Sequence, residues 1–505
     1  MNVSFRDTIE RSRYRPGVAA EHPHYKWWAL SCTSLGMLLA TINSGTLIIA
    51  LPDLERSLGT SLLQLVWVIL AYMISSTVLV LTAGRLSDLF GRKKAYVGGF
   101  ILFTLASFGA GFSGSGTELI LWRILQGVGA AFLFANAAAL VTDAFPKEQL
   151  GLAMGTNTMV AAVGLVIGPV LGGALVSIGW QWVFWFNIPL GLAGAVWGAL
   201  VLHELAKPDT QRGLDLPGTG VFVVGLTGLV YGVSKGGLSG WTEPIVIASL
   251  IVAAVLLPLF VLIESRATAP MLDLTLFENR LFAAATGAAF INGLSRFALL
   301  FLFVFYFQGV QGDDPITAGI KLSPMAIGML ISSPLAGIWA DRRGSRMLAA
   351  LGMLVSAGAL AGMTTLGQTS PYWETALWLG LVGIGSGMFN SPNTAAMMGA
   401  VPANRRGIAA GARTMLQNTG AVLSIAFVLA IVTAAVPKDV LFKIFSGLAS
   451  GLPASELDIF IHNMHTALWV LAATSLIGAG VSLLRPRHVK HPVADALPAA
   501  DRIAA

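Results

Sequence analysis

Stretches of about twenty apolar residues recur along the whole chain, each bounded by charged residues, glycine or proline. A helix rises about 1.5 Å per residue, so a stretch of this length is sufficient to cross the hydrocarbon core of a bilayer. Of the 505 residues, 55% are hydrophobic and 11% are charged, and a water-soluble domain could not bury so much apolar surface. The sequence therefore predicts an all-α integral membrane protein with about fourteen transmembrane helices.

The seventh and eighth predicted helices are the least regular pair. The stretch near residues 217–234 is short and rich in glycine, whereas its partner near residues 244–264 is strongly apolar. Because a crossing in one direction requires a crossing back, both stretches are interpreted as spanning helices. The alternative is about twelve spanning helices with a re-entrant pair.

Lysine and arginine are concentrated on one side of the predicted topology. If the N-terminus is cytoplasmic, the tails and inward loops hold about 24 of these residues and the outward loops about five, as the positive-inside rule expects. We therefore predict a multi-pass protein of the cell membrane with cytoplasmic tails at residues 1–27 and 485–505. The net charge of +6 follows from this bias and from attraction to anionic lipid headgroups, so it does not indicate nucleic-acid binding.

Two predicted inward loops repeat one pattern. The first reads GRLSDLFGRKK and follows the second predicted helix, and the other reads GIWADRRGSRM and follows the tenth. Glycine, aspartate and glycine recur at the same offsets, as Gly84, Asp88 and Gly91 and as Gly337, Asp341 and Gly344.

This repeat predicts the domain organisation, because each loop follows the second helix of a six-helix set. One six-helix bundle is expected over residues 28–203 and a second over residues 282–484. The linker between them, residues 204–281, holds the two inserted helices. The fold class is therefore two six-helix bundles plus two inserted helices.

These loops and several further segments resemble signatures of the major facilitator superfamily. GRLSDLFGRK resembles its motif A, LILWRILQGVGAA from Leu119 resembles its motif B, and GLVIGPVLGG from Gly164 resembles its motif C. WQWVFWFNIPLG from Trp180 and YFQGVQGDDPITAGIKLSP from Tyr306 are similar to the fourteen-span drug:proton antiporter branch. The resemblance covers most of residues 28–484 and implies transport by alternating access.

The motif A loop combines glycines with opposite charges. Gly84 and Gly91 allow helix ends to approach and turn tightly, and Asp88 lies where it can form an ion pair with Arg92. The resemblance implies a cytoplasmic gate here, whose ion pairs form and break as two bundles rock against each other. The alternative is a basic anchoring loop with an incidental acid.

The motif C segment carries small residues at helical spacing around a proline. A stripe of this kind permits close helix packing, and the proline removes one backbone hydrogen bond and bends the helix. Ordinary small-residue packing is the alternative, whereas the resemblance associates the motif with exporters rather than importers. The residues concerned are Gly164, Gly168, Pro169, Gly172 and Gly173.

Two arginines lie inside predicted spans, where a charge costs at least about 2.5–3.5 kcal/mol and should face a wet cavity or a partner. Arg123 belongs to motif B, and the resemblance places it in a central cavity with a part in proton transfer; Gln126 lies one turn further on. Arg296 lies in the ninth predicted span. The alternative for both arginines is that they extend toward the interface or brace backbone carbonyls.

The predicted helix centres contain no clear aspartate or glutamate. In the antiporter branch the first span usually carries an aspartate, in a pattern that resembles LDxTIVNVALP. When its ALP is aligned with residues 50–52 of this chain, Asn43 takes the position of that aspartate. Asparagine does not titrate, so Glu118 at the outer end of the fourth span becomes the proton-coupling candidate. The alternatives are that Glu118 is simply solvated, or that an arginine binds an anionic substrate directly.

Four amide side chains complete the predicted transport cavity. Amides at membrane depth line a cavity or hydrogen-bond neighbouring helices, and the sequence does not separate the two roles. They are Asn390, Asn393, Gln417 and Asn418.

Together these features predict a secondary transporter rather than an enzyme. It would export amphipathic drugs or toxic metabolites by alternating access, by proton antiport, as a monomer in contact with lipid and without a metal or cofactor. No GxxxxGK[ST] motif occurs, which argues against direct use of ATP. The alternatives are a dedicated exporter of one endogenous antibiotic, lipid or anionic metabolite, or a membrane sensor or scaffold that does not transport.

Overall fold

The computed structural model describes residues 22, 24–146, 149–204, 215–267, 270–401, 406–434, 436–445 and 452–486, and for some of them only the backbone. Within these ranges the chain is helical and contains no strand. Eleven of the described helices are long and apolar enough to cross a membrane. Three further long helices, α5, α7 and α15, lie among them, which agrees with the predicted count of about fourteen. Most of the predicted tails lies outside the described residues.

The helices of the N-terminal half precede the inserted pair. They are α2 (Tyr25–Ile49), α4 (Leu62–Phe90), α5 (Arg92–Ala110), α6 (Gly116–Ala144), α7 (Leu150–Val176), and α8 (Trp182–Trp185) with α9 (Asn187–Val201). The inserted pair is α10 (Leu216–Ser239) and α11 (Pro244–Arg266).

The C-terminal half follows with the same number of long helices. They are α12 (Arg280–Val304), α13 (Pro315–Arg343), α14 (Ser345–Gly362), α15 (Tyr372–Gly399), α16 (Arg406–Val432) and α18 (Ala454–Leu483). The short connecting helices are α3 (Leu51–Leu58), η2 (Leu274–Glu278), the π-helical η3 (Phe305–Val310), η4 (Met363–Thr365) and α17 (Lys438–Phe445).

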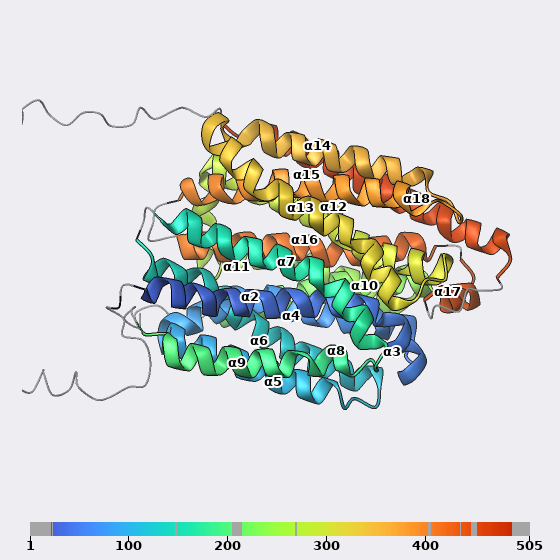
Figure 1. Cartoon of the computed structure of the whole chain (residues 1–505), viewed down its shortest axis with the longest axis horizontal. Helices are drawn as coiled ribbons and strands as arrows, with labels where there is room; N and C mark the ends of the chain where they lie inside the picture. Colours follow the sequence, from blue (N-terminus) through green and yellow to red (C-terminus); the bar gives the residue numbers. More distant parts are fainter. Residues whose placement is uncertain are drawn as a thin grey trace, which may run out of the picture.

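The two halves repeat one packing scheme. In the first half α2 packs on α7, α4 on α6, α5 on α6, and α5 on α9. In the second half α12 packs on α16, α13 on α15, α14 on α15, and α14 on α18. The halves meet through two equivalent contacts, α7 with α13 and α4 with α16. In Figure 1 the long helices run in roughly the same direction, with most of the second half above the first. Pairs of helices related by sequence repeat therefore occupy related positions.

The repeated loops end their helices in the same way. Gly91 follows α4 with φ 105° and Gly344 follows α13 with φ 85°, a backbone region that side-chain-bearing residues rarely adopt. In each loop the next long helix starts at the following residue, α5 at Arg92 and α14 at Ser345. A glycine is required at this position because the chain reverses direction without an intervening loop.

The motif C glycines let α7 touch helices on two sides. A Cβ atom on Gly168 would lie 2.9 Å from the Cα atom of Gly45 in α2, so only glycine permits this approach. On the other side, a Cβ atom on Gly173 would lie 2.5 Å from the carbonyl oxygen of Pro315 in α13. The first contact holds α7 within its own half, and the second joins it to the other half.

The inserted pair lies beside the junction of the halves. Helix α10 packs on α11, on α4 of the first half and on α16 of the second half. Both inserted helices have the length and hydropathy of spanning helices, which favours the fourteen-helix interpretation over a re-entrant pair. Most of α11 is exposed on an apolar surface, as expected of a helix that faces lipid.

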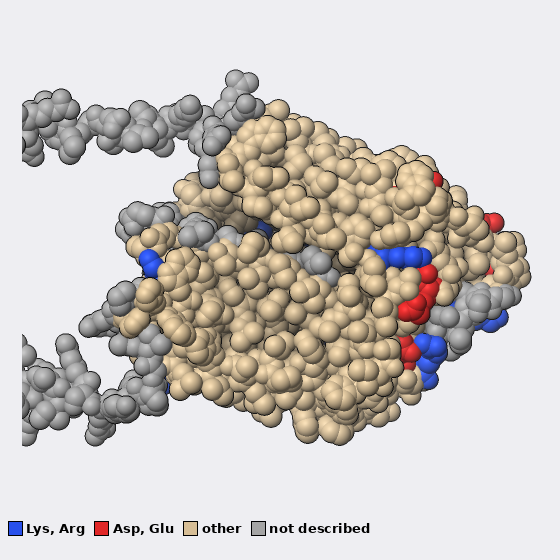
Figure 2. Space-filling view, in the orientation of Figure 1, with Lys and Arg blue, Asp and Glu red and all other residues tan. Residues whose placement is uncertain are grey.

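On the face in Figure 2 charged side chains are sparse along the middle and gather mainly toward the end that carries α3 and α17. This distribution is the one expected of a protein whose central belt contacts lipid hydrocarbon. Helix α2 begins and helix α18 ends at the same end of the bundle (Figure 1). We call this the inner end, after the predicted orientation, and the opposite end, which carries α3 and α17, the outer end.

Candidate transport site

Arg123 of α6 lies in a buried polar group that we call the Arg123 cluster. The side chain is 1% exposed, and its Nε atom donates to the Val68 carbonyl oxygen at 2.9 Å. Its Nη1 atom donates to Gln126 Oε1 and, at 3.4 Å, to Asn43 Oδ1. The guanidinium lies 4.3 Å from the centre of the Tyr72 ring, close enough for a cation–π interaction. The structure thus brings Asn43, Arg123 and Gln126 together.

Two side chains that sequence reasoning missed complete the Arg123 cluster. Gln126 Nε2 donates to Ser107 Oγ of α5 at 2.7 Å, and Asn187 Nδ2 of α9 donates to Asn43 Oδ1 at 3.3 Å. The cluster therefore joins five helices of the first half. Among the described residues that contact Arg123 there is no carboxylate, so two amides, a backbone carbonyl and an aromatic face stabilise the buried charge.

The second half contains a separate group around Arg296. This arginine is partly buried in α12, with Nη1 3.7 Å from Met329 Sδ of α13, and its buried Nε atom has no hydrogen-bond partner in the described part of the chain. One helix away, Gln417 Nε2 donates to Asn390 Oδ1 at 3.4 Å. A buried guanidinium nitrogen without an acceptor indicates a position at which a ligand oxygen would be favourable.

The remaining predicted cavity amides lie elsewhere. Asn393 is fully buried and accepts a hydrogen bond from Arg485, just beyond the inner end of α18, so it contacts a helix terminus. Asn418 is partly exposed on α16. Of the four amides, Asn390 and Gln417 are therefore the ones that the structure brings together.

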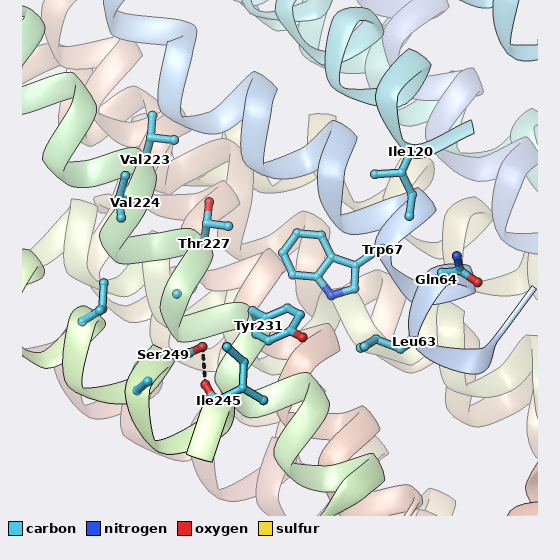
Figure 3. Close-up of a pocket in the computed structure, with 13 residues that line it drawn as sticks. Leu63, Gln64, Trp67, Ile120, Val223, Val224, Thr227, Tyr231, Ile245 and Ser249 are labelled. Carbon is cyan, nitrogen blue, oxygen red and sulfur yellow. Dashed lines mark hydrogen bonds between the residues drawn. The ribbon is translucent and has the colours of Figure 1, made fainter. Parts of the chain in front are cut away.

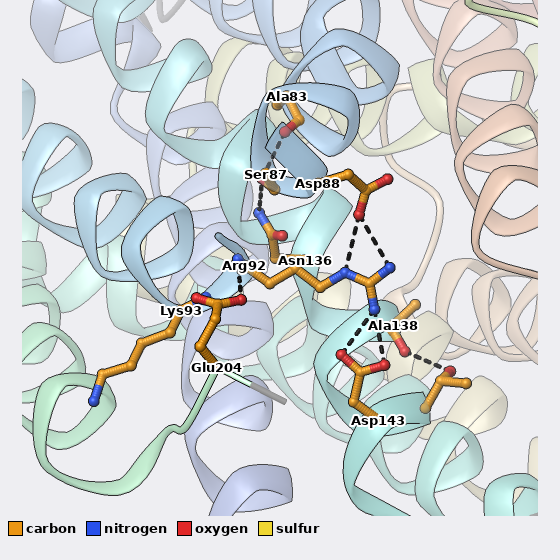
Figure 4. A network of polar contacts seen from close by, with 10 residues as sticks. Ala83, Ser87, Asp88, Arg92, Lys93, Asn136, Ala138, Asp143 and Glu204 are labelled. Atoms are coloured by element: carbon orange, nitrogen blue, oxygen red, sulfur yellow. Dashed lines mark hydrogen bonds and ion pairs between the residues drawn. The ribbon is translucent and has the colours of Figure 1, made fainter. Parts of the chain in front are cut away.

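The predicted gate residues form an ion-pair network at the inner ends of α4, α5 and α6 (Figure 4). Arg92 Nε donates to Asp88 Oδ1 at 3.0 Å, and Nη1 contacts both carboxylate oxygens of Asp143 at 2.8 and 2.7 Å. Asp143 is a member that the motif did not predict. The network holds the ends of three helices together as one unit.

Glu204 fixes the loop of this network from the end of the sixth span. Its Oε1 accepts from the Arg92 backbone N–H at 2.7 Å, and its Oε2 accepts from the Lys93 backbone N–H at 3.2 Å. A carboxylate at the start of α5 satisfies otherwise unpaired helix N–H groups. Only tertiary packing brings Glu204 to this place, and no sequence motif signals it.

The second repeated loop has the same backbone turn. Gly344 has the positive φ described above, and a Cβ atom on Gly337 would lie 3.0 Å from Ser391 Oγ of α15. In the first loop, a Cβ atom on the corresponding Gly84 would lie 3.7 Å from Ala135 Cβ of α6. The side chain of Asp341 lies outside the described residues.

Glu118, the predicted proton-coupling candidate, is exposed at the first turn of α6. Its Oε2 accepts from the Gly114 backbone N–H at 3.0 Å, a local contact at the start of a helix. We expect Glu118→Gln to leave transport and its proton dependence unchanged, because glutamine retains an oxygen acceptor and no buried charge is lost. Transport assays in vesicles with an imposed pH gradient check this, and a loss of gradient-driven transport would contradict it.

Asp53 of α3 is a carboxylate in a polar pocket at the outer end. The pocket has a volume of about 550 Å³ and is also lined by Ser113, Trp180 and Gln181. Burial raises the pKa of Asp53 above its ordinary value, opposed by the charge of Arg56, whose Nη2 lies 2.5 Å from Asp53 Oδ1. Asp53 is therefore a titratable group at the outer end, although not one at mid-membrane.

A second cavity, of about 740 Å³, opens on the lipid-facing side between the first half and the inserted pair (Figure 3). Its lining comes from α4, α6, α10 and α11 and is almost wholly apolar. Trp67 and Tyr231 lie next to each other in the lining, with ring centres 5.9 Å apart. Sequence reasoning missed this cavity because it depends on how α10 packs against α4, which no motif in the chain indicates.

Two packed bundles of spanning helices with buried polar groups in each define a membrane transporter rather than an enzyme. The chain belongs to the major facilitator superfamily, because residues 33–425 and 286–499 match the family described as Major Facilitator Superfamily. This finding confirms the resemblance of the motifs and the predicted fold class.

Relatives and a solved structure agree with this assignment. Over 401 residues the chain is 31% identical to the Tetracenomycin C resistance and export protein of Streptomyces glaucescens, covering 79% of this chain and 74% of that protein. It is 35% identical over 404 residues to Multidrug resistance protein Stp of Mycobacterium tuberculosis (strain CDC 1551 / Oshkosh), with the same coverage. A bacterial homolog to the human lysosomal transporter Spinster, solved inward-facing and unoccupied, shares the fold with TM-score 0.65 at 15% identity, covering 92% of this chain and 97% of that one.

Proposed function

We propose that this chain exports amphipathic small molecules, drugs among them, across the cell membrane by alternating access. The observation that carries the proposal is the similarity above 30% identity to two proteins whose names describe resistance and export. The fold supports it, because two repeated bundles that meet at α7 with α13 and α4 with α16 can rock about these contacts.

We further propose that proton antiport drives this export and that the inner end faces the cytoplasm, with the protein acting as a monomer among lipids. The lysine and arginine bias supports the orientation. The motif A network supports the gating step, since it links three helix ends by ion pairs that can be broken and remade. The described polar groups near Arg123 and Arg296 contain no acid, so proton binding at mid-membrane would have to involve other groups.

A second candidate, an exporter of molecules with an acidic group, is favoured by the charge of the site. In the described part of the chain Arg123 has no carboxylate partner and the buried Nε atom of Arg296 has no hydrogen-bond partner. An anionic group on the substrate would provide the missing acceptors. A cationic substrate would meet repulsion from the same arginines.

Transport into reconstituted vesicles discriminates these functions. The full chain is reconstituted, and uptake of cationic, neutral and anionic amphipathic compounds is measured with an imposed pH gradient, with and without a protonophore. Gradient-driven uptake that collapses with the protonophore supports proton antiport, and the charge of the preferred compounds decides between the two substrate classes. Uptake that equals protein-free vesicles for every compound would contradict export itself, and a non-transporting scaffold would then be favoured.

A further inference from the structure

A carboxyl group lies in the buried face of the inserted helix α11. The buried residues of this helix are Val246, Ala253, Phe260 and Glu264, whose spacing of seven, seven and four places them on one side, toward the protein. Glu264 is 3% exposed. An acid in this position must be paired, hydrogen-bonded or neutral, because an isolated buried charge is very costly.

One oxygen of Glu264 is satisfied and the other is not. Oε2 accepts from the Leu272 backbone N–H at 2.9 Å and so holds the segment after α11 against the helix. Oε1 is buried and has no hydrogen-bond donor in the described part of the chain. The unsatisfied oxygen points to a missing ligand at this position.

Asp215 presents a second unsatisfied oxygen at the same place. It caps α10, with Oδ1 accepting from the Gly218 backbone N–H at 2.8 Å, while its Oδ2 is buried and finds no donor among the described residues. A Cβ atom on Gly218 would lie 2.2 Å from Asp215 Oδ2 and 2.9 Å from Glu264 Oε1. The two carboxyl groups thus lie above one glycine, close enough to hydrogen-bond to each other.

We propose that Asp215 and Glu264 form a proton-binding site at the inner end of the inserted helices, in which one proton is shared between the two carboxyl groups. When both groups are ionised they can only accept hydrogen bonds, and the buried Glu264 anion and the partly buried Asp215 anion repel each other. One proton converts one of them into a donor and satisfies both unpartnered oxygens.

In the described part of the chain no basic side chain forms an ion pair with Asp215 or Glu264, which leaves a proton as the ligand that balances them. Among the described residues, Asp215 is the charged group that acts on Glu264. Three further charged residues lie on the elements packed around the site. Arg266 of α11 is exposed, Asp273 accepts from the Thr275 backbone N–H, and Arg85 belongs to α4. Helix α16 meets α10 toward the outer end, at Gly237 and Ala430.

The site is connected to the helix that carries the gate. Thr219, one residue beyond Gly218, has its hydroxyl oxygen 3.0 Å from that of Thr82 in α4, and both hydroxyls contact Met271 Sδ at 3.5 and 3.6 Å. Asp88 of the gate network lies at the inner end of the same helix α4. When the proton is lost, repulsion between the two carboxylates would push the start of α10 and the segment at Leu272 apart. The displacement of α10 would reach α4 through the contact between Thr219 and Thr82.

Infrared spectroscopy of the purified full chain in lipid nanodiscs tests the proton directly. At pH about 6, where exposed carboxyl groups with pKa of about 4 have lost their protons, the wild type should retain the band of a protonated carboxyl. Glu264→Gln and Asp215→Asn should each remove that band. Asparagine remains a good helix cap, so the second variant should fold even if the first does not. Glu278→Gln, an exposed acid just beyond the site, is the matched control and should leave the band intact.

The measurement needs neither substrate nor gradient, so its result is independent of the proposed export function. A band that survives both substitutions, or no such band in the wild type, would overturn the shared proton. The link between this site and transport does rest on the proposed function. It predicts that the export rate of the wild type changes with the pH on the inner side, and that the export rate of Glu264→Gln does not. A variant with the wild-type pH profile would disprove the link and leave the proton site standing.

Discussion

Replacing Arg123 with alanine should reduce export by about tenfold or more while the protein still reaches the membrane. The substitution removes the donor to the Val68 carbonyl oxygen and to Asn43 Oδ1 in the interior of the first half. Hydrogen bonds to a charged group contribute about 1.5–3 kcal/mol each, and about 1.4 kcal/mol changes a rate or affinity tenfold. Loss of a buried charge also removes a desolvation cost, so the fold should persist.

Arg123→Lys should be nearly as damaging as the alanine variant. A lysine ammonium is a compact point charge and cannot reach the Val68 oxygen, Asn43 and Gln126 from one position, nor can it stack on Tyr72 as a planar guanidinium does. Export from cells expressing each variant, normalised to surface protein, checks both substitutions. Arg280→Ala, which removes an exposed arginine at the start of α12, is the control and should transport normally.

The two substitutions also separate the possible roles of the arginine. If both variants export at the wild-type rate, Arg123 serves only to brace the bundle. If they keep the affinity for neutral compounds and lose it for anionic ones, Arg123 contacts the acidic group of the substrate. Loss of export for every compound with unchanged binding would instead assign the arginine to a step of the transport cycle.

The fold was largely predictable because a membrane imposes a length and a composition on each helix. The long helices, the repeated loops and the pair Asp88 with Arg92, four residues apart at a helix end, follow from local sequence. Even the contact of Arg123 with Gln126 is local, since the residues are one turn apart. These features need no knowledge of how distant helices pack.

The site residues that the sequence did not predict all lie far along the chain from the residues they contact. Ser107, Asn187, Asp143 and Glu204 each complete a site from a different part of the chain. Asn187 lies inside the WQWVFWFNIPLG signature, but that signature does not show which side chain Asn187 contacts. Asn43 shows the reverse case. Its alignment position was predictable, but its function as an acceptor for three neighbouring side chains emerges only from tertiary packing.

Asp88→Asn should retain surface expression and lose most export. The Asp88 side chain is 37% exposed and its pair with Arg92 is of the surface type, which contributes about 0.2–1 kcal/mol, so the folded protein is hardly destabilised. The conformational equilibrium of a transporter is more sensitive, because its states differ by only a few kcal/mol. Neutralising Asp88 leaves Asp143 as the remaining ion-pair partner of Arg92 and removes the ion pair that links α4 to α5.

A matched ion pair elsewhere in the chain isolates the gate from general effects. Lys235 and Glu243 lie 3.1 Å apart at the outer ends of the inserted helices, with side chains 23% and 36% exposed, against 24% and 37% for Arg92 and Asp88. Glu243→Gln should therefore export normally. Asp143→Asn removes the other ion pair of Arg92 and should resemble Asp88→Asn. Equal loss in the Glu243 variant would show that any such pair matters, and wild-type export in Asp88→Asn would remove the gate assignment. Surface expression that falls in step with export would assign the network to stability instead, because an ion pair that controls a conformational equilibrium changes the rate and not the amount of protein.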